Sequence, residues 1–338
     1  MSRSSTPLPY VLLHEAIDDD IRRAVLAANP TQNHHFIAQA EQRQFAFNTE
    51  VNPQNQNVYR WPLRAHQLQS ADSVNIEHSL GAHNLYTLCF IDNSAKQYNL
   101  ESWFNRYESG LEAHIAQLRA LAAPTAASDG IRAVLKLKLL SLLRNPYNRQ
   151  HWFCRHLHRL YLPSDNTPAT DFLTLIRQRP DVEHPLRKRQ FGWHTGEYAP
   201  WLAALYGMMC DSDCAPSRFE HILAALLAPP DAITLRLYRY THGQCLFADC
   251  GFAIQADTQH IRIAFGVAAD MFLLLQIAQP HWQALANTAA SACPLPSPPT
   301  LTLIDNDHLQ RQTYNRLCLA QARQAVYGKS AHADDYLL

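Results

Sequence analysis

The clearest amphipathic pattern lies in the middle of the chain. Between Leu100 and Leu121, apolar or aromatic residues recur every three or four positions, which is the spacing of one helix face. The residues on this face are Phe104, Tyr107, Leu111, Ile115 and Leu118. Ile131–Arg144 is a second and more apolar helix. It ends near Arg144, because the residue before Pro146 disfavours the helical conformation. We expect the two helices to pack side by side.

Similar reasoning predicts further helices and, beyond Pro229–Pro230, a change to strands. The other predicted helices are Asp18–Ala28, Asn33–Phe45, Arg149–Leu160, Ala169–Arg177, Pro200–Cys210 and Arg218–Leu227. Apolar and polar residues then alternate, which indicates an antiparallel β layer made of Ile233–Tyr240, Cys245–Ile254 and Ile261–Phe265. Shorter strands are expected at Val58–Trp61, Leu85–Phe90 and Thr300–Ile304, and a closing helix at Asp305–Tyr327.

These elements predict an α+β fold that is mostly helical. Central helices would pack with a small antiparallel β layer, and a helix would close the C-terminal part. We expect a single compact domain over residues 1–338, with a β and helical segment at 1–95, a helical middle at 96–228, and the β layer and terminal helix at 229–330.

Composition narrows the classes of protein. Of the 338 residues, 47% are hydrophobic and 17% charged, so the chain can bury a large core and is not a disordered protein. Lys+Arg and Asp+Glu number 29 each, and this balance argues against a dedicated nucleic-acid binder. No apolar run approaches the roughly 20 residues needed to cross a bilayer. We expect a cytoplasmic protein whose eight cysteines are reduced.

Several short motifs occur in a particular order. They are His35 with Phe45, Val58-Tyr59, Leu85-Tyr86-Thr87, the pair Glu101 and Glu108, Arg144-Asn145-Pro146, and Asn315 with Ala322-Arg323 and Val326-Tyr327. In this order they resemble the bacterial family called domain of unknown function 4238, which implies one domain and supplies no reaction. Ala38 and Gln42 replace a Pro and a Leu of that family.

The chain departs further from the family on its C-terminal strands. Relatives carry Ser-Asp-Asn-Pro where this chain has Ala248-Asp249-Cys250-Gly251, and Pro-Leu-Ser where it has Gly266-Val267-Ala268. Only Asp249 is retained. If that segment forms a site in relatives, the resemblance implies that the site is altered or lost here.

Glu101 and Glu108 are seven residues apart, so they lie on one helix face about 10 Å from each other along the axis. With His35 and Asp249 they offer carboxylate and imidazole ligands for a divalent metal that activates water. The alternative is that the glutamates form ion pairs with arginines. Arg144 stands at a helix C-terminus, where a cation is favoured, and we expect it to pair with Glu108 or Glu101.

Two other motifs suggest chemistry in the same region. Arg144, Asn145 and His151 resemble the signature of HEPN ribonucleases, which implies His151 as acid–base group and Arg144 as phosphate ligand, although Pro146 interrupts the helix. His151, Cys154 and His158 share one helical face and are zinc-ligand types. A fourth ligand is not evident, and such clusters arise by chance in a chain with 18 histidines.

The remaining motifs have ordinary interpretations. Cys210 with Cys214 and Cys245 with Cys250 do not form matched zinc knuckles, and we expect them to pack as small apolar residues. Arg187–Arg189, followed by Phe191 and Trp193, could contact nucleic acid or an acidic partner, but a solvated connection explains it too. The sequence has no phosphate-binding loop, dinucleotide fingerprint, Gly-x-Ser-x-Gly elbow or His-Glu-x-x-His.

Two functional hypotheses follow. The first is a non-catalytic interaction or regulatory protein with a protein partner, no membrane contact and no evident cofactor. The alternative is a metal- or His-dependent hydrolase, such as a nuclease acting on nucleic acid, with a polar centre at His35, Glu101, Glu108 and Arg144 and a divalent metal as its cofactor. Asp249 completes the set of candidate catalytic residues. Convergence of these groups on an open cleft would favour the alternative.

Overall fold

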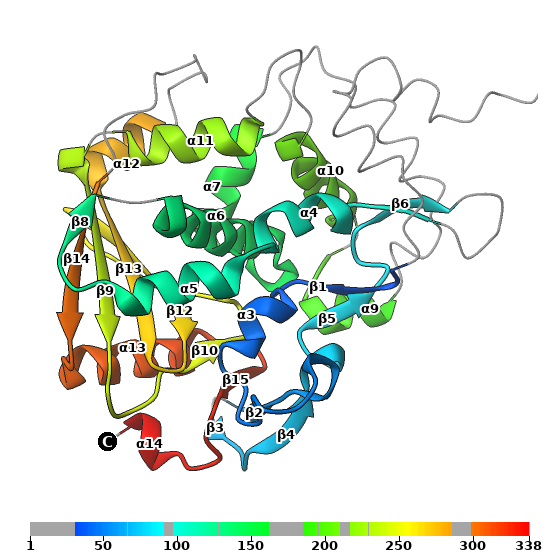
Figure 1. The fold of residues 1–338 in the computed structure, drawn as a ribbon. Coiled ribbons are helices and arrows are strands. Elements are labelled where there is room, and N and C mark those ends of the chain that lie inside the picture. The colour runs from blue at the N-terminus through cyan, green and yellow to red at the C-terminus, as the bar shows by residue number, and fades with distance from the viewer. Residues whose placement is uncertain are drawn as a thin grey trace, which may run out of the picture. The chain divides into compact units, whose positions relative to one another are not determined.

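The computed structural model describes residues 31–65, 67–90, 97–126, 129–161, 185–194, 196–209, 217–228, 230–285 and 299–337 (Figure 1). The chain divides into two compact units. Unit 1 contains residues 1–34, 83–106 and 149–222, and unit 2 contains residues 35–82, 107–148 and 223–338. The predicted helices Asp18–Ala28 and Ala169–Arg177 lie outside the described residues. The single-domain hypothesis stays a prediction.

Unit 1 combines short strands with helices around an aromatic core. Its elements are β6 (Thr87–Phe90), β7 (Gln97–Asn99), α7 (Trp152–Tyr161), α9 (Pro185–Phe191) and α10 (Tyr198–Met209). Trp193 packs within 5.4 Å of both Tyr198 and Trp201, measured between ring centroids, and all three rings are buried. Four elements span a boundary between the units: β1 (Asn33–His35), β5 (Gly81–His83), α4 (Glu101–Glu108) and α11 (Arg218–Leu227).

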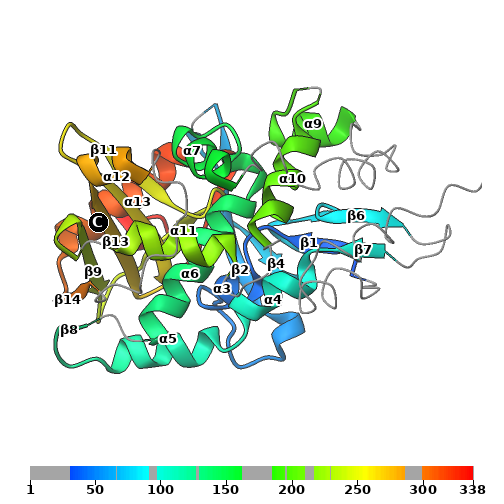
Figure 2. The same ribbon diagram turned by 90° about the horizontal axis from the view of Figure 1, so that it is seen from above.

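The helices of unit 2 include the predicted central pair. Here α5 (Leu111–Ala120) and α6 (Asp129–Arg144) lie side by side, as Figures 1 and 2 show. The other helices are α3 (Gln39–Arg43), α12 (Gln279–Leu285), α13 (His308–Gln321) and α14 (Asp334–Leu337), and short 3₁₀ turns lie at Pro53–Asn55, Ile76–His78, Pro146–Asn148 and Pro230–Ala232. Residues 35–82, 107–148 and 223–338 thus contribute to one unit.

A six-stranded sheet forms the largest β element of unit 2. Its order is β11 (Ala253–Ala256), β12 (His260–Ala268), β13 (Met271–Ala278), β9 (Ile233–Arg239), β14 (Thr300–Asp305) and β8 (Thr125–Ala126), with β14 near one edge (Figure 2). Neighbouring strands are antiparallel except β14 and β9, which run parallel with Leu301 opposite Leu235. Leu235, Ile263 and Leu275 are completely buried and form part of the core.

A second, five-stranded sheet joins distant parts of unit 2. It has the order β10 (Phe247–Ala248), β15 (Ala325–Gly328), β2 (Asn57–Arg64) and β3 (Gln67–Leu68), and β4 (Asp72–Asn75) also pairs with β2. The pairs β10–β15 and β15–β2 are antiparallel. This sheet therefore ties the segment around Asp249 to β15 and, through β15, to β2.

The predicted fold class is wrong, since the described chain is not mostly helical and its β structure is not a small antiparallel layer. One reason is β13, whose first five residues, Met271–Leu275, are all apolar. An apolar run without alternating polar residues gives no clear strand signal in the sequence. The parallel pairing of β14 with β9 joins segments far apart in sequence, which local patterns cannot reveal.

Three predicted helices also end or break differently. Gly110 has φ 78°, in the left-handed region, and this breaks the predicted Leu100–Leu121 helix into α4 and α5. The predicted Asn33–Phe45 helix is strand β1 followed by the short helix α3. The closing helix is wrong over residues 322–327, because α13 ends at Gln321 and β15 follows it. Among the described residues, no helix is both long and apolar enough to span a membrane.

Candidate functional site

The polar residues favoured by the sequence analysis fall mostly inside unit 2. We use the name buried polar cluster for Glu41, Lys138, Ser141, Arg144, Asn145, Asn148 and Asp249, each of which is at most 4% exposed. α6 supplies Lys138, Ser141 and Arg144, at steps of three, so they follow one side of an otherwise apolar helix. Charged groups buried to this degree require partners, and the contacts around them show what they do.

Lys138 and Glu41 form an ion pair inside the unit. The Lys138 Nζ lies 2.5 Å from the Glu41 Oε2, and both side chains are about 95% buried, at 5% and 4% exposure. The other carboxylate oxygen of Glu41 accepts a hydrogen bond from the Ser141 hydroxyl. The pair joins α3 to α6 across 97 residues of sequence and satisfies both buried charges.

Arg144 and Glu108 form the predicted ion pair. The Nη1 of Arg144 lies 2.7 Å from the Oε1 of Glu108, with side-chain exposures of 0% and 19%. The prediction that Arg144 pairs with one of the two glutamates is confirmed. Glu101 stands at the start of α4, where its main-chain N–H donates to the Asn99 Oδ1 at 3.1 Å, and it belongs to unit 1.

Asp249 organises the chain reversal after α13. Its carboxylate accepts main-chain N–H groups of Arg323, Gln324 and Ala325 at 2.8, 2.5 and 3.0 Å. Burial raises the pKa of this carboxyl, and the main-chain hydrogen bonds oppose that effect. Three successive N–H groups held by one carboxylate end the helix and turn the chain into β15. The arrangement explains why the predicted terminal helix stops early.

His35 is a buried and neutral imidazole. Its Nε2 lies 3.1 Å from the Glu77 carbonyl oxygen, and its Nδ1 lies 3.5 Å from the Gln39 amide nitrogen. Burial lowers the pKa of His35 to about 4; the hydrogen bond to Glu77 raises it, and the positive charge of Arg144 lowers it further. At neutral pH the ring therefore holds main chain and side chain together and carries no charge.

The two asparagines of the cluster fasten the end of α6 to the strand β10 segment. The Asn145 Nδ2 donates to the Asp249 carbonyl at 2.7 Å. The Asn148 Nδ2 donates to the carbonyls of Leu142 and Cys250 at 2.9 and 2.8 Å. The Asn148 amide thereby satisfies the Leu142 carbonyl, which has no helix partner because Pro146 lacks an N–H, and both amides bind carbonyls of the segment after β10. Together with Asp249, they make a continuous hydrogen-bonded support.

The metal hypotheses find little support in this geometry. In the part of the chain that the structure describes, no three His, Cys, Asp or Glu side chains stand close enough to share a metal ion. His35 and Asp249 face main-chain partners, as described above. Cys154 is completely buried, and the side chain of His158 lies outside the described residues. A divalent metal stays a prediction.

The other motifs have structural partners of their own. His151 precedes α7, and its Nδ1 accepts the Phe153 N–H at 3.3 Å. Phe191 and Trp193, the aromatic part of the basic stretch, are buried at 7% and 5% exposure, so neither ring is free to stack on a base. Cys154, Cys245, Cys250 and Cys318 are free thiols, while Cys210, Cys214, Cys293 and the side chain of Cys89 lie outside the described residues.

An open groove occupies the surface of unit 2 where β9 and β14 end beside the C-terminus of α5. It has a volume of about 510 Å³. Arg119 and Asp270 pair across it, with Nε–Oδ2 and Nη2–Oδ1 distances of 3.0 and 2.9 Å. Arg239 and Asp305 pair in the same way at 2.8 and 3.0 Å. We call this feature the paired-charge groove.

Arg239 has a second task in this groove. Its Nη1 donates to the carbonyls of Arg119 and Leu121 at 3.2 and 2.5 Å, where α5 ends. A cation at this place satisfies carbonyls left over by the helix. The side-chain hydrogen bonds from Arg239 lower the pKa of the Asp305 carboxyl. Arg119 and Asp270, at 44% and 43% side-chain exposure, are more accessible than Arg239 at 19%.

Sequence analysis missed Glu41, Lys138 and Ser141, although a signal existed. Lys138 and Ser141 interrupt the apolar run of α6 at the same helical spacing as Arg144. A lysine on the buried side of such a helix requires an acidic partner, although its sequence position could not be named. The sequence gives no indication of the groove, because Arg119 and Asp270, which pair there, are 151 residues apart.

No family model, curated protein or solved structure matches the chain. The resemblance to the family called domain of unknown function 4238 therefore stays a prediction that rests on its short motifs. Function must be argued from the two regions described above, the buried polar cluster and the paired-charge groove.

Proposed function

We propose that this chain acts by binding a protein partner, without catalysis of its own, and that the paired-charge groove is the contact surface. The single observation that carries the proposal is the burial of the candidate catalytic groups. Arg144 is 0%, Asp249 1% and His35 7% exposed, and each is engaged by groups of unit 2. A general acid, base or phosphate ligand has to reach its substrate.

The chemistry of the groove favours a protein over a nucleic acid. Arg119 and Arg239 each face an aspartate with two parallel hydrogen bonds, so the two pairs add no net charge. A polyanion gains affinity by neutralising cations, and here both are already neutralised. A protein surface with mixed charges can hydrogen-bond to the outer edges of both pairs, because it supplies donors and acceptors together.

Hydrolysis assays test the catalytic alternative. Purified protein is incubated with RNA and with single-stranded DNA in the presence of Mg²⁺, Mn²⁺ or Zn²⁺. We expect no cleavage above the rate without protein. Cleavage by the wild type that Arg144→Lys abolishes, with an unchanged melting temperature, would reverse the proposal in favour of a hydrolase. The Lys variant keeps the positive charge but loses the planar fork.

A matched pair of bulky substitutions tests the binding surface. Thr241→Trp fills the groove, and Gln255→Trp places the same side chain at an exposed position on β11. Proteins that co-purify with the wild type and with Gln255→Trp, but not with Thr241→Trp, would support the groove as contact surface. Identical recovery with all three chains would contradict it.

A further inference from the structure

The segment after β15 folds back onto unit 2 and buries one aromatic side chain, Tyr336. In residues 330–337, Tyr336 is 2% exposed, whereas His332, Asp334 and Asp335 lie in solvent. The Tyr336 ring meets Trp61 edge to face, with 6.5 Å between centroids. Its hydroxyl donates to the Ser330 carbonyl at 3.1 Å and accepts the Ser330 N–H at 2.6 Å. One aromatic anchor thus holds the segment.

Two buried side chains of α13 hold the backbone of the same segment. The Arg311 Nη1 donates to the Asp335 carbonyl at 2.7 Å, and the Asn315 Nδ2 donates to the Tyr336 carbonyl at 2.8 Å. Arg311 and Asn315 are 4% and 0% exposed. Side-chain donors that bind main-chain carbonyls can hold a helical turn of any sequence. The site for the aromatic ring adds selectivity for a turn that carries a tyrosine.

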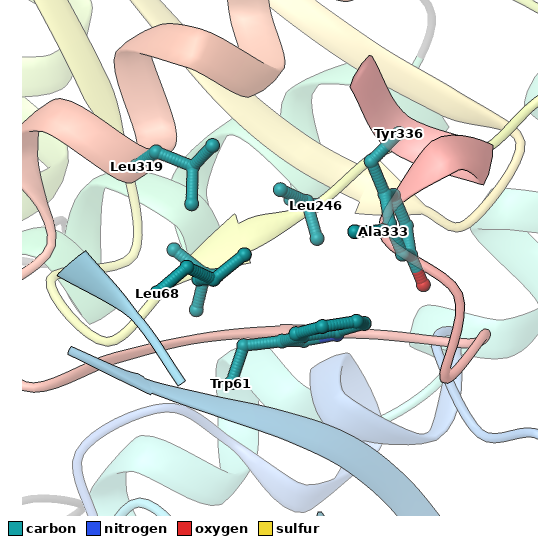
Figure 3. A pocket seen from close by; sticks show the side chains of 7 residues that line it. Trp61, Leu68, Leu246, Leu319, Ala333 and Tyr336 are labelled. Atoms are coloured by element: carbon teal, nitrogen blue, oxygen red, sulfur yellow. The ribbon is translucent and has the colours of Figure 1, made fainter. Parts of the chain in front are cut away.

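The segment does not fill its seat completely. Trp61, Leu68, Leu246, Leu319, Val326, Ala333 and Tyr336 line a cavity of about 10 Å³, and Figure 3 shows most of these side chains around it. This volume is at the lower limit for one water molecule, roughly 10–15 Å³. Leu68 and Leu319 are only half-buried, so the wall reaches the surface. We call this seat, with its Arg311 and Asn315 donors, the Tyr336 pocket.

One polar group of the pocket wall is left unsatisfied. The Trp61 Nε1 is buried and has no hydrogen-bond partner among the described residues. A buried donor without an acceptor costs free energy that a better ligand recovers. The folded-back segment therefore supplies the carbonyls that Arg311 and Asn315 bind and the ring that fills the aromatic site. It supplies no acceptor for the indole N–H of Trp61.

We propose that the Tyr336 pocket is a docking site for a tyrosine-bearing helical turn of a partner protein, and that residues 330–337 compete for it within the chain. The preferred turn places its tyrosine where Tyr336 lies, two carbonyls on Arg311 and Asn315, and an acceptor on Trp61 Nε1. A short segment held by one buried ring and two side-chain hydrogen bonds to its backbone can open locally without unfolding the unit. The site is independent of the paired-charge groove.

The full-length variant Tyr336→Ala vacates the pocket and allows a direct test. A fluorescein-labelled peptide with the sequence of residues 330–338 is titrated against it by fluorescence polarisation. We expect saturable binding, at least tenfold weaker in the wild type because the tethered segment competes at high effective concentration. The same peptide with alanine in place of its tyrosine, and the double variant Tyr336→Ala/Leu319→Glu, should both lose binding.

Other outcomes overturn the proposal. Equal binding of the tyrosine and alanine peptides would show that the pocket selects nothing. Tyr336-dependent dimers of the wild type would make a second copy the occupant. If Tyr336→Ala does not fold, the wild type is titrated with the unlabelled peptide while amide exchange of residues 330–337 is followed. Exchange should rise as the peptide displaces the segment, and unchanged exchange would refute displacement.

Discussion

Ion pairs in the buried polar cluster and in the paired-charge groove use the same chemical groups in opposite surroundings. The Lys138–Glu41 side chains are 5% and 4% exposed, and those of Arg119 and Asp270 are 44% and 43% exposed. Burial removes the hydration of both charges, so losing one partner strands the other. Exposed charges return to water when their partner is lost. The pairs of the cluster are therefore expected to matter more for stability than those of the groove.

Removing one partner of the deepest pair should have the largest effect. Lys138→Met leaves the Glu41 carboxylate buried without its cation, and we expect the free energy of unfolding to fall by about 3–5 kcal/mol. Urea denaturation measures this. The double variant Glu41→Gln/Lys138→Met should recover most of the loss, because its amide still accepts from Ser141. If Lys138→Met alone were as stable as the wild type, buried and exposed ion pairs would not differ in their contribution to stability.

Acid should weaken unit 2 through His35. Its pKa is about 4 in the folded protein and about 6.5 when unfolded, so the unfolded chain binds the proton first. The contribution of the neutral ring is complete above pH 6.5 and is lost as pH falls towards 4, by about 3 kcal/mol at 1.4 kcal/mol per unit. Denaturation midpoints from pH 7.5 to 4 measure it. His35→Gln should show a flatter profile, and parallel profiles would contradict the assignment.

Within the groove, two arginines with similar ion pairs should differ in effect. Arg239→Ala removes the cation at the end of α5, and we expect a loss of about 1–2 kcal/mol. Arg119→Ala breaks only an exposed pair and should cost under about 1 kcal/mol, a difference that shrinks further at 1 M salt. Thermal melts at two salt concentrations separate them. Equal losses would mean that exposure does not govern these pairs.

Part of the candidate site could be predicted because its signals are local. Apolar spacing and Pro146 indicate a buried helix that ends at Arg144, and the cation at that end predicts an acidic partner on the neighbouring helix. The structure has this pair. Glu41 could not be predicted as the partner of Lys138. The two residues are 97 positions apart, and no local sequence pattern shows that they meet. The fold class failed for a related reason, because the first five residues of β13 are all apolar and show no alternation.

The sequence by itself determined the helical segments with strong periodicity, the balance of charge and the position where α6 ends. Helical periodicity and the end of α6 depend on residues at most four positions apart, and the charge balance is a count over the whole sequence. Tertiary structure alone decided that Asp249 turns the chain after α13, that β14 runs parallel to β9, and that α14 seats Tyr336 beside Trp61. Each of these depends on groups far apart in sequence, and only burial makes their pairing favourable.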